Sequence, residues 1–446
     1  MLLRLIMKNF LSFYNETVFD MFPNPKREHF TSHIYTDGAT PLLKEAAVYG
    51  SNASGKTNLI KAFQFLKFFV TDKDFHQRVE FEDYRYSLSS DDKHPFELTV
   101  EFQNGRTYIY KLAINGDIDE TLWQSGLGRE ANRLLFHRSG IAIEGPVVIN
   151  TDSSKALLKK SRRSSVLSLN KDFPVLGGEE VAEAYNWFSE VLTVATLNYQ
   201  ISALIAMMSE NKPLLDFTNN LLVWLKVNEG LEVKEFEFNK WLETKNGRNF
   251  AKATRDGVVI PDGYRLLTGQ KDRRNEFNIV KKDGEQVVQE FLFREKGVDG
   301  HQGYMDIDSQ SDGTVRLLTL IPLIYEAIKN GRVVVIDEID NSFHSELIFE
   351  LVRFYAESSS TGQLIFTTHE TRLMNQQLLM RVDEMWKVEK RYGSSVLSSL
   401  NDYKIHGTIN VEHGYREGRF GGIPDIGQYE PFASLPVRNI PTTTMW

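Results

Sequence analysis

The chain has 446 residues, 41% hydrophobic and 25% charged, which is ordinary globular composition and allows about three domains. Its 52 basic and 60 acidic residues give a net charge of -8, which excludes a global positive field for nucleic acid and leaves only local basic patches. The absence of cysteine excludes disulfides and thiolate chemistry, and it favours a reducing, cytoplasmic compartment.

No segment has the length and apolarity expected of a membrane span. The longest apolar stretch, 315–328, contains Arg316, Pro322 and Glu326 and is shorter than the ~20 residues that cross a bilayer. The first eight residues carry charge too early for the apolar region of a secretory signal. We therefore expect a soluble protein that does not contact membranes.

The N-terminal 74 residues predict strands followed by a helix. Apolar and polar side chains alternate in two parts of 1–22, which predicts two strands with a bend between them. Strand character returns at 42–49, and 58–70 predicts a helix. A glycine-containing loop lies between that strand and that helix, which is the order a phosphate-binding unit needs.

The middle of the chain differs in pattern from both ends. Residues 96–102 and 107–114 alternate with period two around Asn104 and Gly105, which predicts a β-hairpin. The pattern becomes helical at 153–227 and strand-like again at 232–300. We therefore predict that 75–300 is an inserted β-rich and helical arm region.

The C-terminal part predicts alternating helices and buried strands. Helices are expected at 315–329 and 345–357, and continuous apolar strands of the parallel type at 332–336 and 363–367. The fold class is therefore α/β, a mixed or parallel sheet with flanking helices. Its N-terminal lobe is predicted at 1–74, its C-terminal lobe at 301–402 and a tail at 403–446.

Residues 50–57 match the pattern G-x-x-x-x-G-K-[ST], which binds phosphate. Glycines let backbone N–H groups approach phosphate oxygens, the lysine reaches the β and γ oxygens, and the threonine hydroxyl binds Mg²⁺. The alternative is a glycine turn that caps a helix; a chance match is expected in only ~1–2% of chains this long. The predicted nucleotide-binding residues are Gly50, Ser51, Asn52, Ala53, Ser54, Gly55, Lys56, Thr57 and Asn58.

Two adjacent acids end the predicted buried strand at 332–336. Asp337 is expected to hold Mg²⁺ through water, together with Thr57. Glu338 is expected to orient and deprotonate the water that attacks the nucleotide. A solvated Asp-Glu turn is the alternative, but a phosphate-binding loop in the same chain favours the catalytic interpretation.

These motifs together resemble the ABC-type P-loop ATPase heads of the SMC, Rad50 and RecF group. The resemblance implies that 310–314 is the signature motif, in which Ser311 and Gly313 touch the γ-phosphate bound to a second subunit. It also implies a D-loop at 339–344 and makes His369 the switch histidine. Asp312 stands where many such heads have glycine, and no Q-loop glutamine is placed.

The whole-chain layout is similar to bacterial ATPases of the RloA and AbiL abortive-infection type, over about residues 1–70 and 300–425. That resemblance implies an ATPase that uses ATP and Mg²⁺, forms a homodimer or higher homo-oligomer through ATP-sandwiched heads, and controls a separately encoded nuclease-like effector in anti-phage defence. A nucleic acid or a phage protein would be its trigger. The alternatives are a non-hydrolysing ATP-dependent scaffold for a nuclease partner and a RecF-type DNA-repair ATPase.

The densest basic run is 159–163, and a shorter cluster contains Lys271, Arg273 and Arg274. Either could contact a phosphate backbone. In an acidic chain, a solvated helix face is the favoured interpretation of both.

Overall fold

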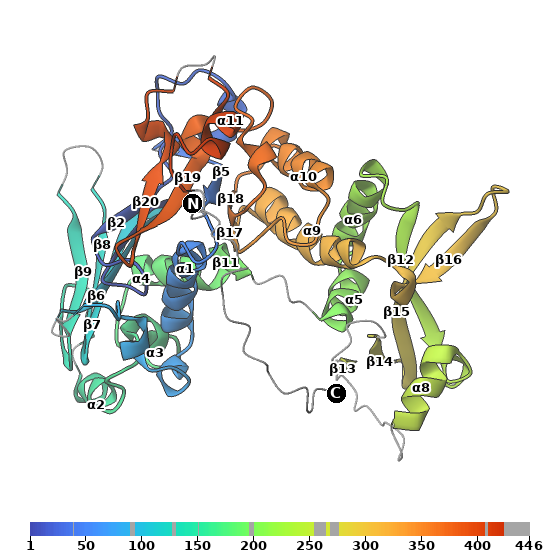
Figure 1. Ribbon diagram of the computed structural model, residues 1–446. Helices are drawn as coiled ribbons and strands as arrows, with labels where there is room; N and C mark the ends of the chain where they lie inside the picture. The colour runs from blue at the N-terminus through green and yellow to red at the C-terminus, as the bar shows by residue number, and fades with distance from the viewer. Residues whose placement is uncertain are drawn as a thin grey trace, which may run out of the picture.

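The computed structural model describes residues 1–38, 40–89, 94–126, 131–149, 151–195, 200–253, 265–267, 276–405 and 409–422. Within these ranges, three larger sheets and their helices form the protein (Figure 1). The cluster of Lys271, Arg273 and Arg274 and the tail beyond 422 lie outside the described residues.

A six-stranded sheet holds the centre of the fold, and its first five strands run parallel. Its three central strands, at 45–49, 333–336 and 363–367, are fully buried because helices or a second sheet cover both faces. In spatial order they are β11 (Leu192–Ala195), β17 (Val333–Ile336), β18 (Gln363–Thr367), β5 (Glu45–Tyr49), β19 (Met385–Arg391) and the antiparallel β20 (Ser394–Ser399).

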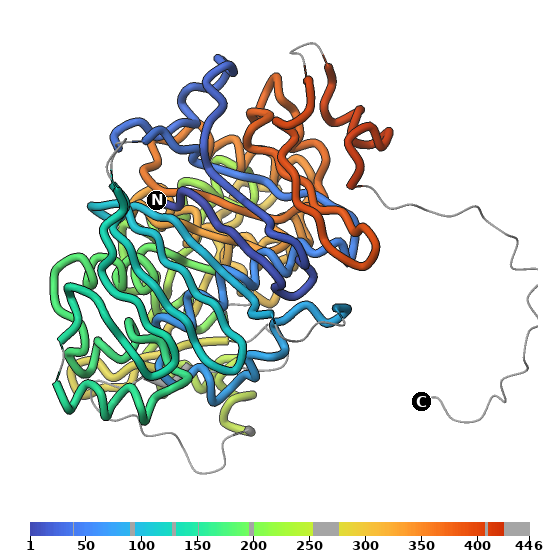
Figure 2. Tube along the Cα trace, turned by 90° about the vertical axis from the view of Figure 1, so that its left-hand side faces the viewer, coloured from blue at the N-terminus to red at the C-terminus, as the bar shows by residue number. Residues whose placement is uncertain are grey.

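A seven-stranded antiparallel sheet lies beside it (Figure 2). β6 alternates buried and half-buried side chains because one face packs on the core. In order the strands are β10 (Ala142–Glu144), β9 (Arg133–Ser139), β8 (Asp117–Gln124), β7 (Arg106–Asn115), β6 (Phe96–Asn104), β1 (Leu2–Lys8) and β2 (Thr17–Asp20). The short pair β3 (Ile34–Tyr35) and β4 (Leu42–Leu43) precedes β5.

Helix α1 (Lys56–Thr71) is covered by both of these sheets. Its Leu59, Phe63 and Phe69 share one apolar cluster with Leu98 of β6 and Val335 of β17. A helix with sheets on opposite sides must be apolar on most of its circumference, as the sequence 59–70 is. α2 (Asp152–Lys160), α3 (Val166–Asp172) and α4 (Glu179–Asn186) complete this side.

The opposite face of the parallel sheet is covered by α9 (Asp312–Asn330) and α10 (Ser345–Glu357). Leu317 and Ile321 of α9 and Val352 of α10 share an apolar cluster with Val334 and Ile336 of β17. The side chains on the two faces of β17 therefore pack into two separate hydrophobic cores, because successive side chains of a strand point in opposite directions. α11 (Val411–Arg416) packs near the end of the described chain.

The structure divides the predicted arm at 75–300 into two parts. Strands β6–β10 pair onward from β1, and β11 joins the parallel sheet beside β17, so 96–195 lies in the same layers as both predicted lobes. The strand at 192–195 was not predicted, since 153–227 has a helical pattern; pairing with β17 decides its conformation.

Only the part beyond β11 projects from these layers (Figure 1). α5 (Ile201–Glu210) and α6 (Lys212–Trp224) pack on α9, and a third sheet follows them. It contains β12 (Gly230–Glu237), β15 (Glu285–Lys296), β14 (Asn278–Lys282), β13 (Arg265–Leu267) and β16 (Gln302–Asp306), with α7 (Phe238–Trp241) and α8 (Lys245–Ala253) beside it.

The predicted strand-like stretch 232–300 also contains the helices α7 and α8, whereas the predictions at 96–114 and 315–367 agree with the structure to within a few residues at the element ends. The predicted hairpin is β6 and β7, with Gly105 at φ +71 in its turn. The predicted helix at 345–357 is α10, and the predicted strand at 363–367 is β18. In the described part of the chain, no helix is both long enough and apolar enough to span a bilayer.

Candidate nucleotide-binding site

The predicted phosphate-binding loop joins the end of β5 to the start of α1. A Cβ atom added to Gly50 would lie 2.4 Å from the carbonyl oxygen of Val388 in β19, and one added to Gly55 would lie 2.2 Å from Oγ of Ser395 in β20. Gly55 also has φ +117, which L side chains rarely adopt. The loop therefore approaches the neighbouring strands so closely that these two positions require glycine.

Lys56, the first residue of α1, lies at the centre of the loop. Its Nζ donates to the carbonyl oxygens of Gly50 at 2.8 Å and Ser51 at 3.3 Å, and it lies 3.0 Å from Nε2 of His369. Burial lowers the pKa of Lys56, and the nearby carboxylates of Asp337 and Glu338 oppose that shift. The ammonium group thus contacts the predicted histidine and lies within the electrostatic influence of both predicted acids.

The two predicted acids follow β17 at the carboxyl end of the parallel sheet. Thr367, which ends the neighbouring strand β18, donates its hydroxyl to Oδ1 of Asp337 at 2.6 Å and accepts the N–H of Glu338 at 2.7 Å. Glu338 has φ +52, which is uncommon for a side chain of this size. Thr367 therefore fixes the orientation of both acids.

His369 follows β18 and is positioned by the segment after Glu338. Its backbone N–H donates to the carboxylate of Asp340 at 3.3 and 3.2 Å. Burial, and then the charge of Lys56, lower the pKa of His369, which favours the neutral imidazole. A neutral Nε2 can accept a hydrogen bond from the ammonium group of Lys56.

The predicted signature residues lie at the start of α9. Ser311 caps that helix, because its Oγ accepts the N–H of Thr314 at 3.1 Å. A Cβ atom on Gly313 would meet the carbonyl oxygen of Ser342, in the predicted D-loop, at 3.2 Å. The structure brings these two residues beside the D-loop, and the hydrogen bonds in the described part of the chain do not join them to the loop at 50–55.

A serine network on the other side supports the phosphate-binding loop. Asn58 donates from Nδ2 to Oγ of Ser12 at 2.8 Å. Ser395 donates to Oγ of Ser12 at 2.7 Å and lies 2.5 Å from the carbonyl oxygen of Ser54. This network joins the first turn of α1, the bend between β1 and β2, and β20 around the loop.

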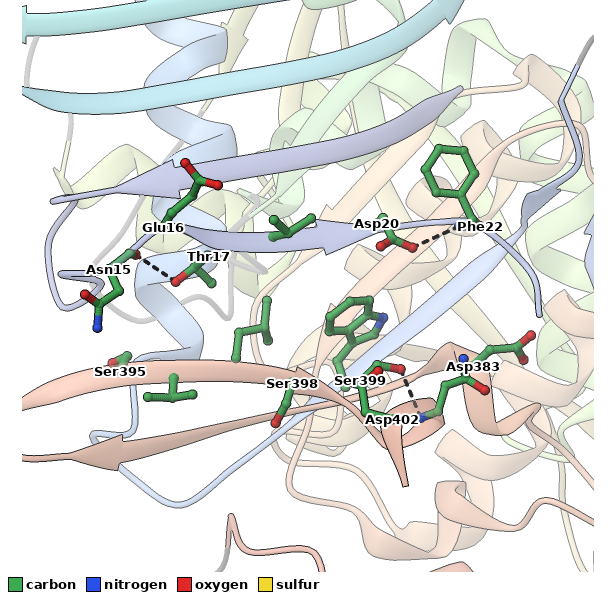
Figure 3. Close-up of a pocket in the computed structure, with 15 residues that line it drawn as sticks. Asn15, Glu16, Thr17, Asp20, Phe22, Asp383, Ser395, Ser398, Ser399 and Asp402 are labelled. Carbon is green, nitrogen blue, oxygen red and sulfur yellow. Dashed lines mark hydrogen bonds between the residues drawn. The ribbon is translucent and has the colours of Figure 1, made fainter. Parts of the chain in front are cut away.

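A cavity of about 400 Å³ opens next to this network, between β2 and β20 (Figure 3). Glu16, Asp20, Asp383 and Asp402 lie around it, and Ser395 lines its end. Burial raises the pKa of Asp20, and the charge of Asp402 adds to that shift. Four acidic side chains disfavour a triphosphate, so this cavity is not the nucleotide site.

The residues at 50–57 fit a nucleotide with Mg²⁺. Gly50 and Gly55 pack too closely on their neighbours to carry a side chain. The loop backbone is therefore uncovered at these two positions, and its N–H groups can approach a phosphate. Oγ of Ser54 is buried and has no hydrogen-bond partner among the described residues. The exposed Thr57 hydroxyl and the half-buried Asp337 are oxygen ligands of the type that Mg²⁺ prefers.

Sequence reasoning missed two residues of this site. Thr367 had a detectable signal, because it ends a buried strand close to the predicted histidine. Ser395 had none, since it approaches the loop only through the packing of β20.

The predicted basic run at 159–163 spans the C-terminal end of α2. Its Arg163 pairs with Glu80 and Glu82 at 3.5 and 3.3 Å. These pairs favour the solvated interpretation of that run.

The strand, glycine loop and helix, with acids at the end of β17 two strands away in the same parallel sheet, define a P-loop nucleotide-binding protein of the α/β class. A family model described as "AAA domain, putative AbiEii toxin, Type IV TA system" matches residues 46–375. This range is well over half of the chain, and the chain belongs to that family of AAA domains.

Comparison with curated proteins finds no significant match. Among solved structures, the chain is similar to the SMC head domain from Thermotoga maritima, with 14% identity, a TM-score of 0.42, and coverage of 89% of this chain and 98% of that one. It is also similar to an SMC head bound to the C-terminal winged-helix domain of ScpA, with 17% identity, a TM-score of 0.42, and coverage of 90% and 99%. A third similar structure is the Pyrococcus furiosus SMC head with an extended coiled coil, bound to the C-terminal domain of ScpA, with 15% identity, a TM-score of 0.39, and coverage of 90% and 97%.

Proposed function

We propose that the chain is an ATP-hydrolysing, ABC-type head that dimerises around nucleotide and controls a partner effector. One observation carries the proposal. The ammonium group of Lys56 lies 3.0 Å from His369, and Thr367 beside that histidine holds both Asp337 and Glu338. Five residues from three distant segments thus meet at the carboxyl edge of one parallel sheet, where ligands bind in open α/β sheets.

Each of these residues has a role in hydrolysis. Lys56 and the loop backbone bind the β- and γ-phosphates, and Glu338 orients and deprotonates the attacking water. Thr57 and Asp337 hold Mg²⁺, which supplies positive charge to the phosphoryl group being transferred. As a neutral imidazole, His369 has one N–H that can donate to the γ-phosphate and one nitrogen that can accept from the attacking water.

The positive φ of Glu338 favours an enzyme over a non-hydrolysing scaffold. A strained backbone conformation at a non-glycine residue persists where the surrounding structure enforces it, and such residues cluster at functional sites. Here Thr367 and the segment to Asp340 enforce it. A scaffold that only binds ATP would need no such carboxylate beside the magnesium ligand.

The signature residues support action on a second subunit. Ser311 and Gly313 lie at the start of α9, beside the D-loop of their own chain. A head-to-head homodimer would place them over the nucleotide of its partner. Gln200, which is exposed and follows β11, is our candidate for the Q-loop glutamine, because β11 lies next to β17 in the sheet.

The biological role that we propose is anti-phage defence in the cytoplasm. The matched family description names a putative toxin of a type IV toxin–antitoxin system, which supports a role in such a system. Nucleic acid or a phage protein would act as the trigger. The acidic net charge and the paired Arg163 disfavour a RecF-type DNA-repair role.

Substitution of Lys56 tests the site directly. Lys56→Ala removes a lysine–phosphate interaction of about 2–4 kcal/mol, so ATP affinity is expected to fall ~30- to 1000-fold. Lys61→Ala, one turn further along α1 and exposed, is the matched control and should bind normally. Isothermal titration of both variants measures the effect, and unchanged affinity in Lys56→Ala would reject the assignment.

A further inference from the structure

Three buried ionisable side chains meet at a point remote from the phosphate-binding loop. They are His33 at the end of the short helix η1 (Thr31–His33), Glu45 at the start of β5, and Glu384 at the end of η7 (Val382–Glu384). Their exposed fractions are 2%, 0% and 0%. The segment before η1 contacts the turn that leads into β19, because Arg381 donates to the carbonyl oxygens of Arg27 at 3.2 Å and Asn24 at 3.4 Å.

The ligand atoms of the three side chains face one another. Nδ1 of His33 lies 3.0 Å from Oε1 of Glu384 and 3.6 Å from Oε1 of Glu45. One ligand atom from each of the three lies within 4.8 Å of the other two, and no other trio of metal-binding side chains in the described ranges meets this criterion. The burial and convergence of these atoms distinguish this cluster from ordinary surface acids.

The charges in the cluster are incompletely compensated by the protein. The carboxylate of Glu384 accepts the backbone N–H of Arg381 at 2.7 Å. The guanidinium group of Arg381 instead pairs with Asp383 at 2.7 Å and donates to backbone carbonyls of the N-terminal segment. Among the described residues, no N–H or hydroxyl group donates to either oxygen of the fully buried Glu45, and its carboxyl group faces that of Glu384 closely enough for a hydrogen bond when one of the two carries a proton.

Burial disfavours a charge on each of the three groups, and it raises the pKa of Glu45 well above its usual value. A fully buried carboxyl group needs a proton or a cation beside it. The three ligand atoms converge on one point, which is where such a cation would lie.

We propose that His33, Glu45 and Glu384 bind one divalent transition-metal ion of the zinc type. Tetrahedral zinc with N and O ligands at about 2.0–2.2 Å sets its ligands roughly 3.3–3.5 Å apart, and the two distances from Nδ1 fall on either side of that range. The ion's two positive charges balance two carboxylates. Three protein ligands are too few for calcium, which takes six to eight oxygens.

The metal would act as a structural clamp. It would join the segment around His33, the strand that leads into the phosphate-binding loop, and the turn that leads into β19. Glu45 is at the opposite end of β5 from Gly50, about 16 Å away at ~3.3 Å per residue, so the ion would not take part in hydrolysis. Its effect is therefore expected on stability and not on the chemical step.

The test uses the full chain with Asp337→Asn as background, so that the nucleotide site does not collect metal. The protein is stripped with a chelator, equilibrated with Zn²⁺ and desalted. Bound zinc is then measured by mass spectrometry, and the melting temperature is measured with zinc and with chelator. We expect one zinc ion per chain and a melting temperature that rises by several degrees with zinc, because the ion binds the folded state.

Two variants separate this site from unspecific binding. Glu45→Gln keeps the shape of the side chain but removes a ligand charge, so it should lose both the bound zinc and the zinc-dependent rise in melting temperature. His137→Asn is the matched control, since His137 lies beside Asp119 and Glu144 at the surface and should not affect the stoichiometry.

Two outcomes would overturn the proposal. One is a background protein that retains no zinc; a Glu45→Gln variant with a higher melting temperature would then show that Glu45 carries a proton, shared with Glu384. The other is a Glu45→Gln variant that retains a full equivalent of zinc, because the metal would then lie elsewhere.

Discussion

Glu338 unites three features at the scale of the residue: it follows a buried strand, it has a positive φ, and its N–H is held by Thr367. Glu338 is exposed beyond the carboxyl end of β17, where water can reach its carboxylate. This combination of a rigid backbone and an accessible side chain suits a general base, which must be fixed in position and open to a water molecule.

Glu338→Gln is therefore expected to lower turnover by ~10²- to 10⁴-fold while ATP binding is retained, since glutamine keeps the shape but cannot accept a proton. Turnover, ATP retention and molecular mass by light scattering are measured on one preparation. Glu357→Gln, at the exposed end of α10, is the control. Near-normal turnover would show that Glu338 is not the base, and loss of ATP binding would indicate a damaged fold.

The lowered pKa of His369 predicts a pH dependence of stability. The unfolded chain takes up this proton near the usual pKa of 6.5, whereas the folded chain does so only at lower pH. Between these values the unfolded state binds more protons, so the free energy of unfolding falls as pH decreases below 6.5. Buried His33 contributes in the same direction, whereas the raised pKa values of Glu45 and Glu384 contribute in the opposite direction.

His369→Gln should remove the contribution of His369 alone, so the variant should lose less stability than the wild type between pH 7.5 and pH 5.0. Urea unfolding of wild type and variant at pH 7.5, 6.0 and 5.0 measures the slopes. His413→Gln, an exposed histidine of α11, provides the comparison. Equal slopes in wild type and His369→Gln would contradict the lowered pKa.

At the scale of the element, Gln363 joins the two large sheets. This buried residue of β18 accepts the N–H of Leu2 at 2.6 Å and donates to the carbonyl oxygens of Leu2 and Leu43 at 3.0 Å each. The backbone of β1 thus has partners in the parallel sheet as well as in its own. A buried backbone group without a partner is costly, so this glutamine stabilises the contact between layers.

Gln363→Leu keeps most of the side-chain volume but leaves up to three buried backbone groups unpaired. We expect it to lower the free energy of unfolding by about 3 kcal/mol or more. Gln377→Leu changes an exposed glutamine and should shift it by less than about 0.5 kcal/mol. Denaturant unfolding of both variants is the measurement, and equal stabilities would show that Gln363 does not join the layers.

At the scale of the whole molecule, the proposed composite site requires two chains. A Ser311→Arg chain should bind ATP through its own phosphate-binding loop but fail to hydrolyse it, because the signature acts in trans. A Lys56→Ala chain fails for the opposite reason. In a dimer of the two variants, one site lacks both elements and the other site is intact.

An equal mixture of the two inactive variants should therefore recover about a quarter of wild-type turnover, because half of the dimers are mixed and each has one working site. Size-exclusion chromatography with differently tagged chains confirms that mixed dimers form. If they form and turnover stays at zero at every mixing ratio, the signature does not act in trans.

The sequence by itself determined the local features of this protein. The P-loop pattern at 50–57, the acids after 332–336 and the alternation at 96–114 each depend on nearby residues, and elements appear at all three places. Such patterns can be interpreted because turn chemistry, side-chain period and strand burial are local properties of the chain.

Only the tertiary structure decided which distant segments meet. The pattern at 153–227 does not reveal that 192–195 pairs with β17, and nothing in 75–144 shows that these strands extend the sheet of β1. In the sequence, Ser395 and Gln363 are ordinary polar residues of strands. Their hydrogen-bond partners become apparent only from the packing of the sheets. The convergence of His33, Glu45 and Glu384 has the same origin, because contacts between residues far apart in sequence depend on the packing of whole layers, which a local pattern does not encode.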